Sequence, residues 1–204
     1  MIIAVDGPAA AGKGTIARAL ARHFGYHFLD TGSLYRMVGL AALRAGGEPI
    51  TARVAIAAAH NLNPQTFSDA ELRNEQVGAA ASIVASIPEV RAALLNFQRA
   101  FARKEPGAVL DGRDIGTVVC PEAEAKLFIT ASPEVRAKRR QKELGSSDYE
   151  MILADIRARD ERDSKRPTAP LVAAKDAVRL DTSEMDIAAA VAAAVRAVEE
   201  RRVP

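Results

Sequence analysis

The sequence has few of the residues that mark secreted or nucleic-acid-binding proteins. Its 204 residues include one cysteine, Cys120, so no disulfide can form within the chain, and we expect a reducing compartment. Tryptophan is absent and aromatic residues make up 4%, which leaves few stacking platforms for single-stranded nucleic acids. The formal net charge is +2, too small to indicate a polyanionic partner. We therefore expect no nucleic acid as partner.

Long hydrophobic runs are also missing. The apolar stretches are too short, or too interrupted by charge, to span a bilayer, and no basic residues precede the first of them as in a signal peptide. Hydrophobic residues make up 49% and charged residues 26%, which is typical of a folded globular chain. The length suits one domain with small inserted lobes. We expect a cytoplasmic protein without a membrane partner.

What the chain does contain begins at its N-terminus, where an apolar run leads into a glycine-bearing turn and then a helix. Ile2–Val5 suits a buried parallel strand, and the helix continues to Phe24 with Gly25 as its stop. Between them the spacing Gly-x-x-x-x-Gly-Lys ends at Lys13. Glycines let backbone N–H groups converge on one anion, the helix dipole favours negative charge there, and the lysine adds a full charge. These features predict a nucleotide-binding P-loop made of Gly7, Pro8, Ala9, Ala10, Ala11, Gly12, Lys13, Gly14 and Thr15.

The hydroxyl of this loop is shifted by one residue. Gly14 occupies the position at which serine or threonine commonly binds Mg²⁺, and Thr15 follows it. The sequence Gly-Lys-Gly-Thr resembles the nucleoside monophosphate kinases more than the GTPases or motor ATPases.

Four further short strands are predicted, at 26–29, 108–110, 127–129 and 178–180, with helices between them. Five strands alternating with helices predict an α/β fold with a parallel sheet and helices on both faces. A helix over 187–198 is predicted to bury Ile187, Val191, Val195 and Val198, with Asp181-Thr182-Ser183 as its cap. Another begins at a capping box formed by Ser147 and Glu150.

The stretch 51–86 is alanine-rich and helical in character, with an interruption at 61–68. A further helix from Pro88 to Phe101 has a predicted buried stripe of Val90, Leu94, Phe97 and Phe101. This region reads as a lobe inserted into the sheet. We predict one P-loop domain with a core at 1–45, 102–147 and 172–204, an inserted substrate-binding lobe at about 46–101 and a lid at about 148–171.

Charged residues gather where the carboxyl ends of the strands are expected, which is where open α/β sheets bind ligands. Asp30 ends the second strand, and Arg36 lies in the first turn of the helix that follows. Asp111 comes directly after the apolar strand 108–110, a common place for a carboxylate that helps to hold Mg²⁺ or its waters.

Basic residues cluster twice in the second half of the chain. The helix predicted after Ser132 carries Arg136, Lys138, Arg139 and Arg140, which form either a solvated face or a clamp for phosphates. From residue 157 the next helix is almost wholly charged, with Arg159, Asp163 and Arg166 on one face. Exposed intrahelical ion pairs contribute only about 0.3–0.5 kcal/mol each. We therefore favour a mobile arginine-rich lid that closes over a polyanion.

Four motifs, in this order and spacing, resemble those of the bacterial cytidylate kinase family, and they cover nearly the whole chain. They are Asp6-Gly7-Pro8 with Gly12-Lys13-Gly14-Thr15, Asp30-Thr31-Gly32 with Tyr35-Arg36, the run Asp111-Gly112-Arg113-Asp114-Ile115-Gly116-Thr117-Val118-Val119, and Arg159-Asp160 with Arg162-Asp163 and Arg166. The resemblance implies a P-loop kinase that transfers the γ-phosphoryl group of ATP to CMP or dCMP in pyrimidine nucleotide metabolism. It implies Mg²⁺ as cofactor, ATP and CMP or dCMP as binding partners, and we expect a monomer.

The resemblance also implies roles for single residues. The phosphate of CMP would be held by Arg36, Arg113 and Arg166, cytosine would be read by Ser82, Arg91 and Asp114, and the sugar would be bound by Arg159 and Asp163, with Thr31 and Tyr35 as further substrate-binding positions. Charge on the moving phosphoryl group would be stabilised by Lys13, Arg140 and Arg162. Mg²⁺ would be held by Thr15 and Asp111, directly or through water.

Three departures from the family pattern are visible. Ala9 and Ala10 stand where the family often has serine and glycine, and Thr31 replaces a serine but keeps the hydroxyl. The insert around 63–75 is shorter than in members that carry a small β-hairpin lobe.

Two kinds of alternative remain open. A uridylate- or shikimate-type kinase of the same fold would also need the P-loop, but Asp114 beside Arg113 would then have no cytosine to read. In the other class, the chain would bind ATP without transferring phosphate, or would bind nucleic acid through its arginines.

Overall fold

The computed structural model describes residues 1–72, 74–145 and 148–202. The chain forms two compact units, one from Met1–Leu29 with Phe101–Pro204 and the other from Asp30–Ala100. Within the described residues no single helix is long and apolar enough to cross a bilayer, and one pair of helices, Glu75–Val84 and Pro88–Ala102, meets that test only when combined across a bend of 97°.

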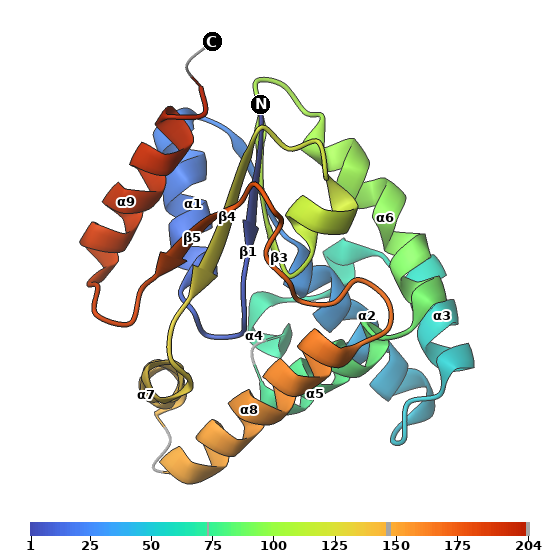
Figure 1. The fold of residues 1–204 in the computed structure, drawn as a ribbon. Coiled ribbons are helices and arrows are strands. Elements are labelled where there is room, and N and C mark those ends of the chain that lie inside the picture. The colour runs from blue at the N-terminus through green and yellow to red at the C-terminus, as the bar shows by residue number, and fades with distance from the viewer. Residues whose placement is uncertain (73, 146–147, 203–204) are drawn as a thin grey trace. The chain divides into compact units, whose positions relative to one another are not determined.

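The first unit is built around a five-stranded parallel sheet, as the sequence predicts (Figure 1). The strands lie in the order β2-β3-β1-β4-β5. They are β1 (Ile2–Asp6), β2 (His27–Asp30), β3 (Ala108–Gly112), β4 (Ala125–Thr130) and β5 (Val178–Asp181). The register pairs Val5 with Asp111 and Asp6 with Phe128. Asp6, the last residue of β1, and Asp111, the penultimate residue of β3, therefore lie close together at the carboxyl ends of the strands.

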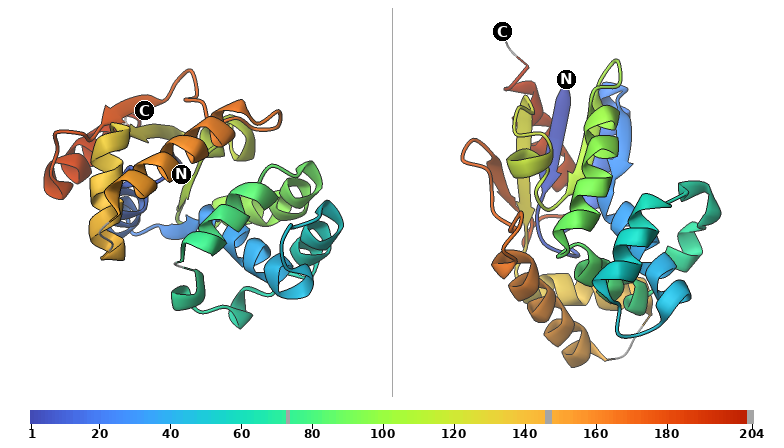
Figure 2. Two further views of the ribbon diagram at one scale, coloured as in Figure 1. Left: turned by 90° about the horizontal axis from the view of Figure 1, so that it is seen from below. Right: turned by 90° about the vertical axis from the view of Figure 1, so that its right-hand side faces the viewer.

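One apolar cluster holds the sheet against α1 (Lys13–Phe24) and α9 (Ile187–Glu199), which lie together on one side of it in Figure 1. Ile3, Leu127 and Ile129 supply the strand side of the cluster, and Leu20 and Val198 supply the helix side. Near the carboxyl ends of the strands, α7 (Pro133–Leu144) packs against α8 (Tyr149–Lys165), and the left view of Figure 2 shows the two helices side by side. A short π-helical turn, η2 (Ile115–Val119), follows β3 and packs against β1 and β3.

The second unit is helical over its described residues and contains no strand there, apart from the end of β2 at its first residue. Its elements are α2 (Thr31–Gly46), α3 (Ala52–His60), the 3₁₀ turn η1 (Pro64–Thr66), α4 (Asp69–Leu72), α5 (Glu75–Val84) and α6 (Pro88–Ala102). The predicted interruption at 61–68 is confirmed, since only η1 lies within it. Gly39 lets α2 and α5 approach closely, because a Cβ there would lie 2.9 Å from the backbone nitrogen of Ala81.

The boundary of this unit falls earlier than the sequence suggests. It begins at Asp30 rather than near residue 46, so that α2 belongs to it. The physical reason is packing: Leu34 and Val38 of α2 join one buried cluster with Ala55 of α3, Val84 of α5 and Val90 of α6.

Two of the predicted buried stripes are partly wrong. Phe97 of α6 is 48% exposed and Ile187 of α9 is 69% exposed. Val90 and Leu94 of α6 and Val198 of α9 are buried as predicted. They are joined by Arg91, Gln98 and Ala102 in α6 and by Ala190 and Ala194 in α9. The largest apolar residues do not mark the buried face of these helices, and α9 packs through alanines that allow close approach to its neighbours.

The predicted cap of α9 is also wrong. The N-cap is Asp186, whose side chain accepts from the amide of Ala189 at 2.7 Å. Asp181 instead closes a local turn by accepting from the amide of Ser183 at 2.9 Å. Ser147, the predicted cap of α8, lies outside the described residues, and Asp148 accepts from the amide of Met151 at 2.9 Å.

Candidate active site

The P-loop is shaped by a backbone that only glycine can follow at its first residue. Gly7 has a φ of +148°, and a Cβ there would lie 1.9 Å from the carbonyl oxygen of Ile129. Gly12 has a φ of +86° and directly precedes the first turn of α1. Lys13 is buried, and its Nζ donates to the carbonyl oxygen of Pro8 at 3.0 Å. The lysine is thus held across the loop, where an anion on the helix N-terminus would meet it.

Asp111 at the end of β3 is the acidic partner of the loop. Its Oδ1 lies 3.8 Å from Lys13 Nζ, and both side chains are almost fully buried. A Cβ at Gly14 would lie 3.2 Å from Asp111 Oδ2, so a serine or threonine at residue 14 would crowd the carboxylate. Thr15, one residue later, is exposed. The shift of the hydroxyl therefore has a local steric reason.

These residues fit a magnesium ion held largely by phosphate oxygens. Carboxylate and hydroxyl oxygens are the protein ligands that Mg²⁺ prefers, and it commonly takes one or two carboxylates together with substrate phosphates. Among the described residues there is no cluster of three or more histidine, cysteine, aspartate or glutamate side chains that would form a complete metal cage. Asp111, beside the P-loop, is placed to supply one such carboxylate.

Four of the predicted substrate residues come together in two ion pairs. Arg113 Nε lies 3.0 Å from Asp163 Oδ2, and Arg166 Nη2 lies 3.2 Å from Asp114 Oδ1. Each ion pair joins the turn after β3 to the C-terminal end of α8. Arg166 also donates through Nε to the carbonyl oxygen of Ala169. We call this group the four-residue charge cluster.

Asp6 is a site residue that sequence reasoning missed as an individual contributor. It is buried, and its two carboxylate oxygens accept from the amides of Ile115 at 2.7 Å and Gly116 at 2.8 Å. Burial, with the charges of Asp114 and Asp111 adding to it, raises the pKa of Asp6 from 3.8 to about 7. Its position between a buried strand and the first P-loop glycine is the feature of the sequence that indicates a site residue.

The basic residues of α7 include two with a structural role, which is neither of the two predicted roles, a solvated face or a phosphate clamp. Arg136 is buried and contacts Asp160 of α8, and Arg139 donates to the hydroxyl and the carbonyl oxygen of Thr182 at 3.0 and 2.6 Å. The Thr182 hydroxyl lies within hydrogen-bond distance of the carbonyl oxygens of Thr130 at 3.1 Å and of Ala11 in the P-loop at 3.3 Å. These arginines brace the P-loop from outside. Lys138 is exposed, in keeping with a solvated position.

The predicted catalytic arginines lie nearer to solvent. Arg140 Nη1 pairs with Glu143 Oε2 of its own helix at 3.1 Å. Arg162 is exposed on α8, and Arg159 is partly buried.

The remaining candidates belong to the second unit. The Arg91 guanidinium lies 5.6 Å from the centre of the Tyr35 ring, and both residues are buried. The Ser82 hydroxyl oxygen is buried and has no hydrogen-bond partner among the described residues. Thr31 is buried at the start of α2, and Arg36, one turn later, is partly exposed. An unpaired buried hydroxyl is costly, which makes Ser82 a candidate for a ligand contact.

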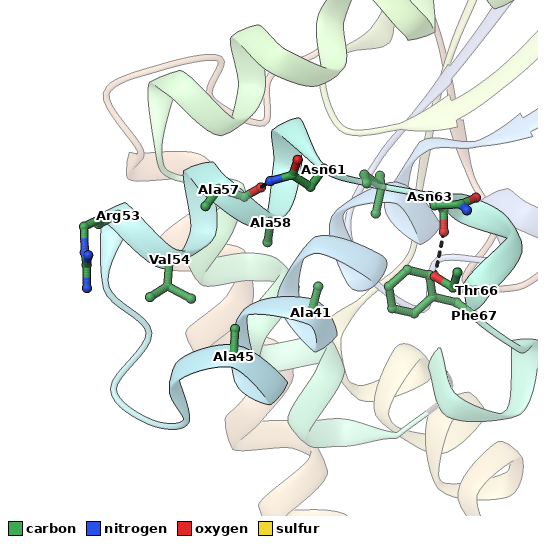
Figure 3. Close-up of a pocket in the computed structure, with 11 residues that line it drawn as sticks. Ala41, Ala45, Arg53, Val54, Ala57, Ala58, Asn61, Asn63, Thr66 and Phe67 are labelled. Carbon is green, nitrogen blue, oxygen red and sulfur yellow. Dashed lines mark hydrogen bonds between the residues drawn. The ribbon is translucent and has the colours of Figure 1, made fainter.

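A cavity in the second unit is not formed by these candidates. It has a volume of about 550 Å³ and is lined mainly by apolar side chains such as Ala41, Ala57 and Phe67 (Figure 3). Arg53 is the only charged residue among those that line it, and the Thr66 hydroxyl is already bonded to the carbonyl oxygen of Asn63 at 2.8 Å. With one cation at its edge, this cavity does not have the chemistry of a nucleotide phosphate site.

Solved structures with this fold include three proteins at low sequence identity. They are an uncharacterized protein from Eubacterium ventriosum (TM-score 0.57, 14% identity, 98% of each chain), a Thermus thermophilus protein (TM-score 0.52, 23% identity, 100% of this chain and 98% of the other) and a sugar kinase from Janibacter sp. (TM-score 0.51, 15% identity, 97% and 94%). These similarities concern the fold alone.

Sequence comparison is more specific. The chain is 58% identical to a cytidylate kinase from Xanthobacter autotrophicus over 99% of each chain. It is 55% identical to one from Rhodopseudomonas palustris over 99% of this chain and 97% of the other, and 56% identical to one from Rhodospirillum rubrum over 96% and 95%. The family model for cytidylate kinase matches residues 3–200. The chain therefore belongs to the cytidylate kinase family.

Proposed function

We propose that the protein transfers the γ-phosphoryl group of ATP to CMP or dCMP, giving ADP and CDP or dCDP. Its family makes it an ATP-dependent kinase. The observation that supports the substrate assignment best is the four-residue charge cluster, because it gathers two arginines and two carboxylates where strand β3 ends. Arginines suit a phosphate, and a carboxylate suits the amino group of cytosine.

The donor end of the reaction is the P-loop. The amides of the loop and Lys13 would bind the β- and γ-phosphates of ATP, and the loop is already shaped for them by Gly7 and Gly12. Asp111 and Thr15 would hold Mg²⁺, directly or through water, and the ion supplies neutralisation of phosphate charge when bound. The contacts of Arg139 and Thr182 would help to keep the loop in place while ligands exchange.

The acceptor nucleotide would be bound first of all by the charge cluster. Arg36, Arg113 and Arg166 would bind the phosphate of CMP. Because Arg113 and Arg166 are paired with Asp163 and Asp114, the phosphate would compete with these carboxylates for the arginines. Asp114 would then be available to accept from the amino group of cytosine.

Further contacts would complete the recognition of the nucleotide. The buried hydroxyl of Ser82 and the guanidinium of Arg91, which lies against Tyr35, would read the base. Arg159 and Asp163 would bind the sugar, and Thr31 would contribute its hydroxyl. Uracil carries a carbonyl where cytosine has its amino group, so it would face Asp114 without a proton to donate.

The chemistry needs no general base. The acceptor is already a phosphate, whose second pKa is about 6, so catalysis consists of positioning and charge neutralisation. Lys13, Arg140 and Arg162 would offset the charge that develops on the moving phosphoryl group. A lid that closes over both nucleotides would exclude water, which otherwise accepts the phosphoryl group.

An acceptor panel tests the proposal. ATP consumption is measured with Mg²⁺ and with CMP, dCMP, UMP, AMP or shikimate as separate acceptors. We expect turnover with CMP and dCMP and little with UMP. Comparable turnover with UMP would contradict the reading of cytosine by Asp114. Turnover with shikimate alone, or the absence of turnover with every acceptor tested, would contradict the proposed function. A cytoplasmic location, a monomeric state and the absence of nucleic-acid or membrane partners stay predictions from the sequence.

A further inference from the structure

Arg136 of α7 connects three separate parts of the first unit. The residue is 3% exposed. Its Nε donates to the carbonyl oxygen of Ala131, just after β4, at 2.9 Å, and its Nη1 donates to the carbonyl oxygen of Ala9 in the P-loop at 3.3 Å. On its outer side, Nη1 and Nη2 meet Oδ1 and Oδ2 of Asp160 in α8 at 2.9 and 2.6 Å. One side chain therefore touches the sheet, the nucleotide loop and the lid helix.

The geometry of this contact fixes direction as well as distance. A guanidinium and a carboxylate that meet through two parallel hydrogen bonds allow little rotation of either group. Asp160 lies between Arg159 and Arg162 in the same helix, whose period is 3.6 residues per turn. Fixing the side chain of Asp160 therefore fixes the rotation of α8 about its axis, and with it the directions in which these two arginines leave the helix.

We propose that Arg136 and Asp160 form a positioning pair that couples the shape of the P-loop to the placement of the lid arginines. Neither residue is assigned to touch a nucleotide; the pair acts through Ala9 and through the orientation of α8. The inference rests on the proposed kinase function. It goes beyond that function because it gives a positioning role to two residues that are not assigned to contact a substrate.

A matched control lies on the same two helices. Arg157 of α8 and Glu134 of α7 form an ion pair at 2.9 Å, but their side chains are 61% and 50% exposed. The hydrogen bond between Arg157 and Glu134 links α7 to α8 and does not involve the P-loop. If holding the two helices together were all that mattered, loss of either pair would have a similar effect on activity.

The experiment compares Asp160→Asn with Glu134→Gln in the full-length protein. For each variant, kcat, the KM values for CMP and ATP, the rate of ATP hydrolysis without acceptor, and the melting temperature are measured. We expect Asp160→Asn to lower kcat by about tenfold to hundredfold, because small misplacements of charged groups have effects of that size. The KM for CMP should also rise, because Arg159, which would bind the sugar, leaves α8 in a direction that Asp160 fixes. Hydrolysis relative to transfer should rise.

Two further variants separate coupling from loss of folding. Arg136→Lys keeps the charge but cannot satisfy the P-loop carbonyl and both carboxylate oxygens at once, so its kcat should fall by a similar factor. The double variant Arg136→Lys with Asp160→Asn should be about as active as Arg136→Lys alone, because residues that act as one unit are not additive.

The outcomes divide clearly. A wild-type protein that phosphorylates CMP, together with an Asp160→Asn variant whose kcat matches that of Glu134→Gln, would overturn the inference alone. Multiplicative effects in the double variant, or a lower melting temperature with unchanged kcat, would also overturn it. A wild-type protein that does not phosphorylate CMP would overturn the proposed function, and the inference would fall with it.

Discussion

The P-loop and the lid helix α8 belong to the same unit but are held in shape by different means. The P-loop is defined by its backbone: Gly7 lies so close to Ile129 that no side chain fits between them. The lid is defined by side-chain charges, since Asp160, Asp163 and Arg166 each pair with a residue outside α8. A single added atom, such as a Cβ at Gly7, would break the backbone constraint. Charge pairs, in contrast, can exchange partners when a charged ligand binds. We therefore expect the P-loop to keep one binding geometry and α8 to respond to the binding of substrate.

The largest effect should come from breaking the backbone constraint. Gly7→Ala places a Cβ where the structure has 1.9 Å to the Ile129 carbonyl oxygen, so we expect loss of ATP binding and a destabilisation of at least about 3 kcal/mol. The control is Gly25→Ala, which has a φ of +68° but no atom within 4 Å and should cost about 1 kcal/mol. Urea unfolding and ATP titration measure both. Similar costs for the two variants would contradict the steric account.

The next effect concerns the charge cluster. Asp114→Asn keeps the size of the side chain but reverses part of its hydrogen bonding, and we expect kcat/KM for CMP to fall by about a hundredfold. The kcat/KM for UMP should fall less, so that the preference for CMP over UMP becomes smaller. Steady-state kinetics with both acceptors measure this. An unchanged ratio of CMP to UMP would show that Asp114 does not read the base.

A third effect depends on pH and concerns Asp6, which directly precedes the P-loop and accepts from two amides of η2. Its pKa is raised from 3.8 to about 7 in the folded protein, so the folded state binds the proton more tightly than the unfolded state. The stability that the protonated carboxyl contributes is present below about pH 4 and is lost as the pH rises through 7, a change on the order of 4 kcal/mol. We expect wild type to lose stability relative to Asp6→Asn across this range. Melting temperatures of wild type and Asp6→Asn that change with pH by the same amount would contradict the prediction.

The smallest effect should come from the solvent side of the lid. Lys165 and Glu161 form an i,i+4 pair at 2.7 Å with both side chains largely exposed. We expect Glu161→Gln to leave the melting temperature and kcat unchanged within error, because exposed pairs contribute little. A loss of activity as large as that of Asp160→Asn would mean that the total charge of the lid, rather than its buried pairs, controls the reaction.

The same contrast explains how much could be predicted from the sequence. The five strands, the P-loop and the Gly25 stop of α1 follow from local patterns of apolar residues and glycines, and the structure confirms them. The partners of Arg136 and Arg113 lie 24 and 50 residues away, beyond the reach of any local pattern. The resemblance gave the four charge-cluster residues roles but could not indicate that they pair with one another.

The most direct test of the account is calorimetric titration of the wild-type protein with CMP and, separately, with UMP. Binding isolates recognition of the base from transfer of the phosphoryl group. The account predicts that CMP binds at least about tenfold more tightly than UMP, because a buried carboxylate without a donor is costly. Equal affinities would contradict the central claim that Asp114 and its neighbours select cytosine.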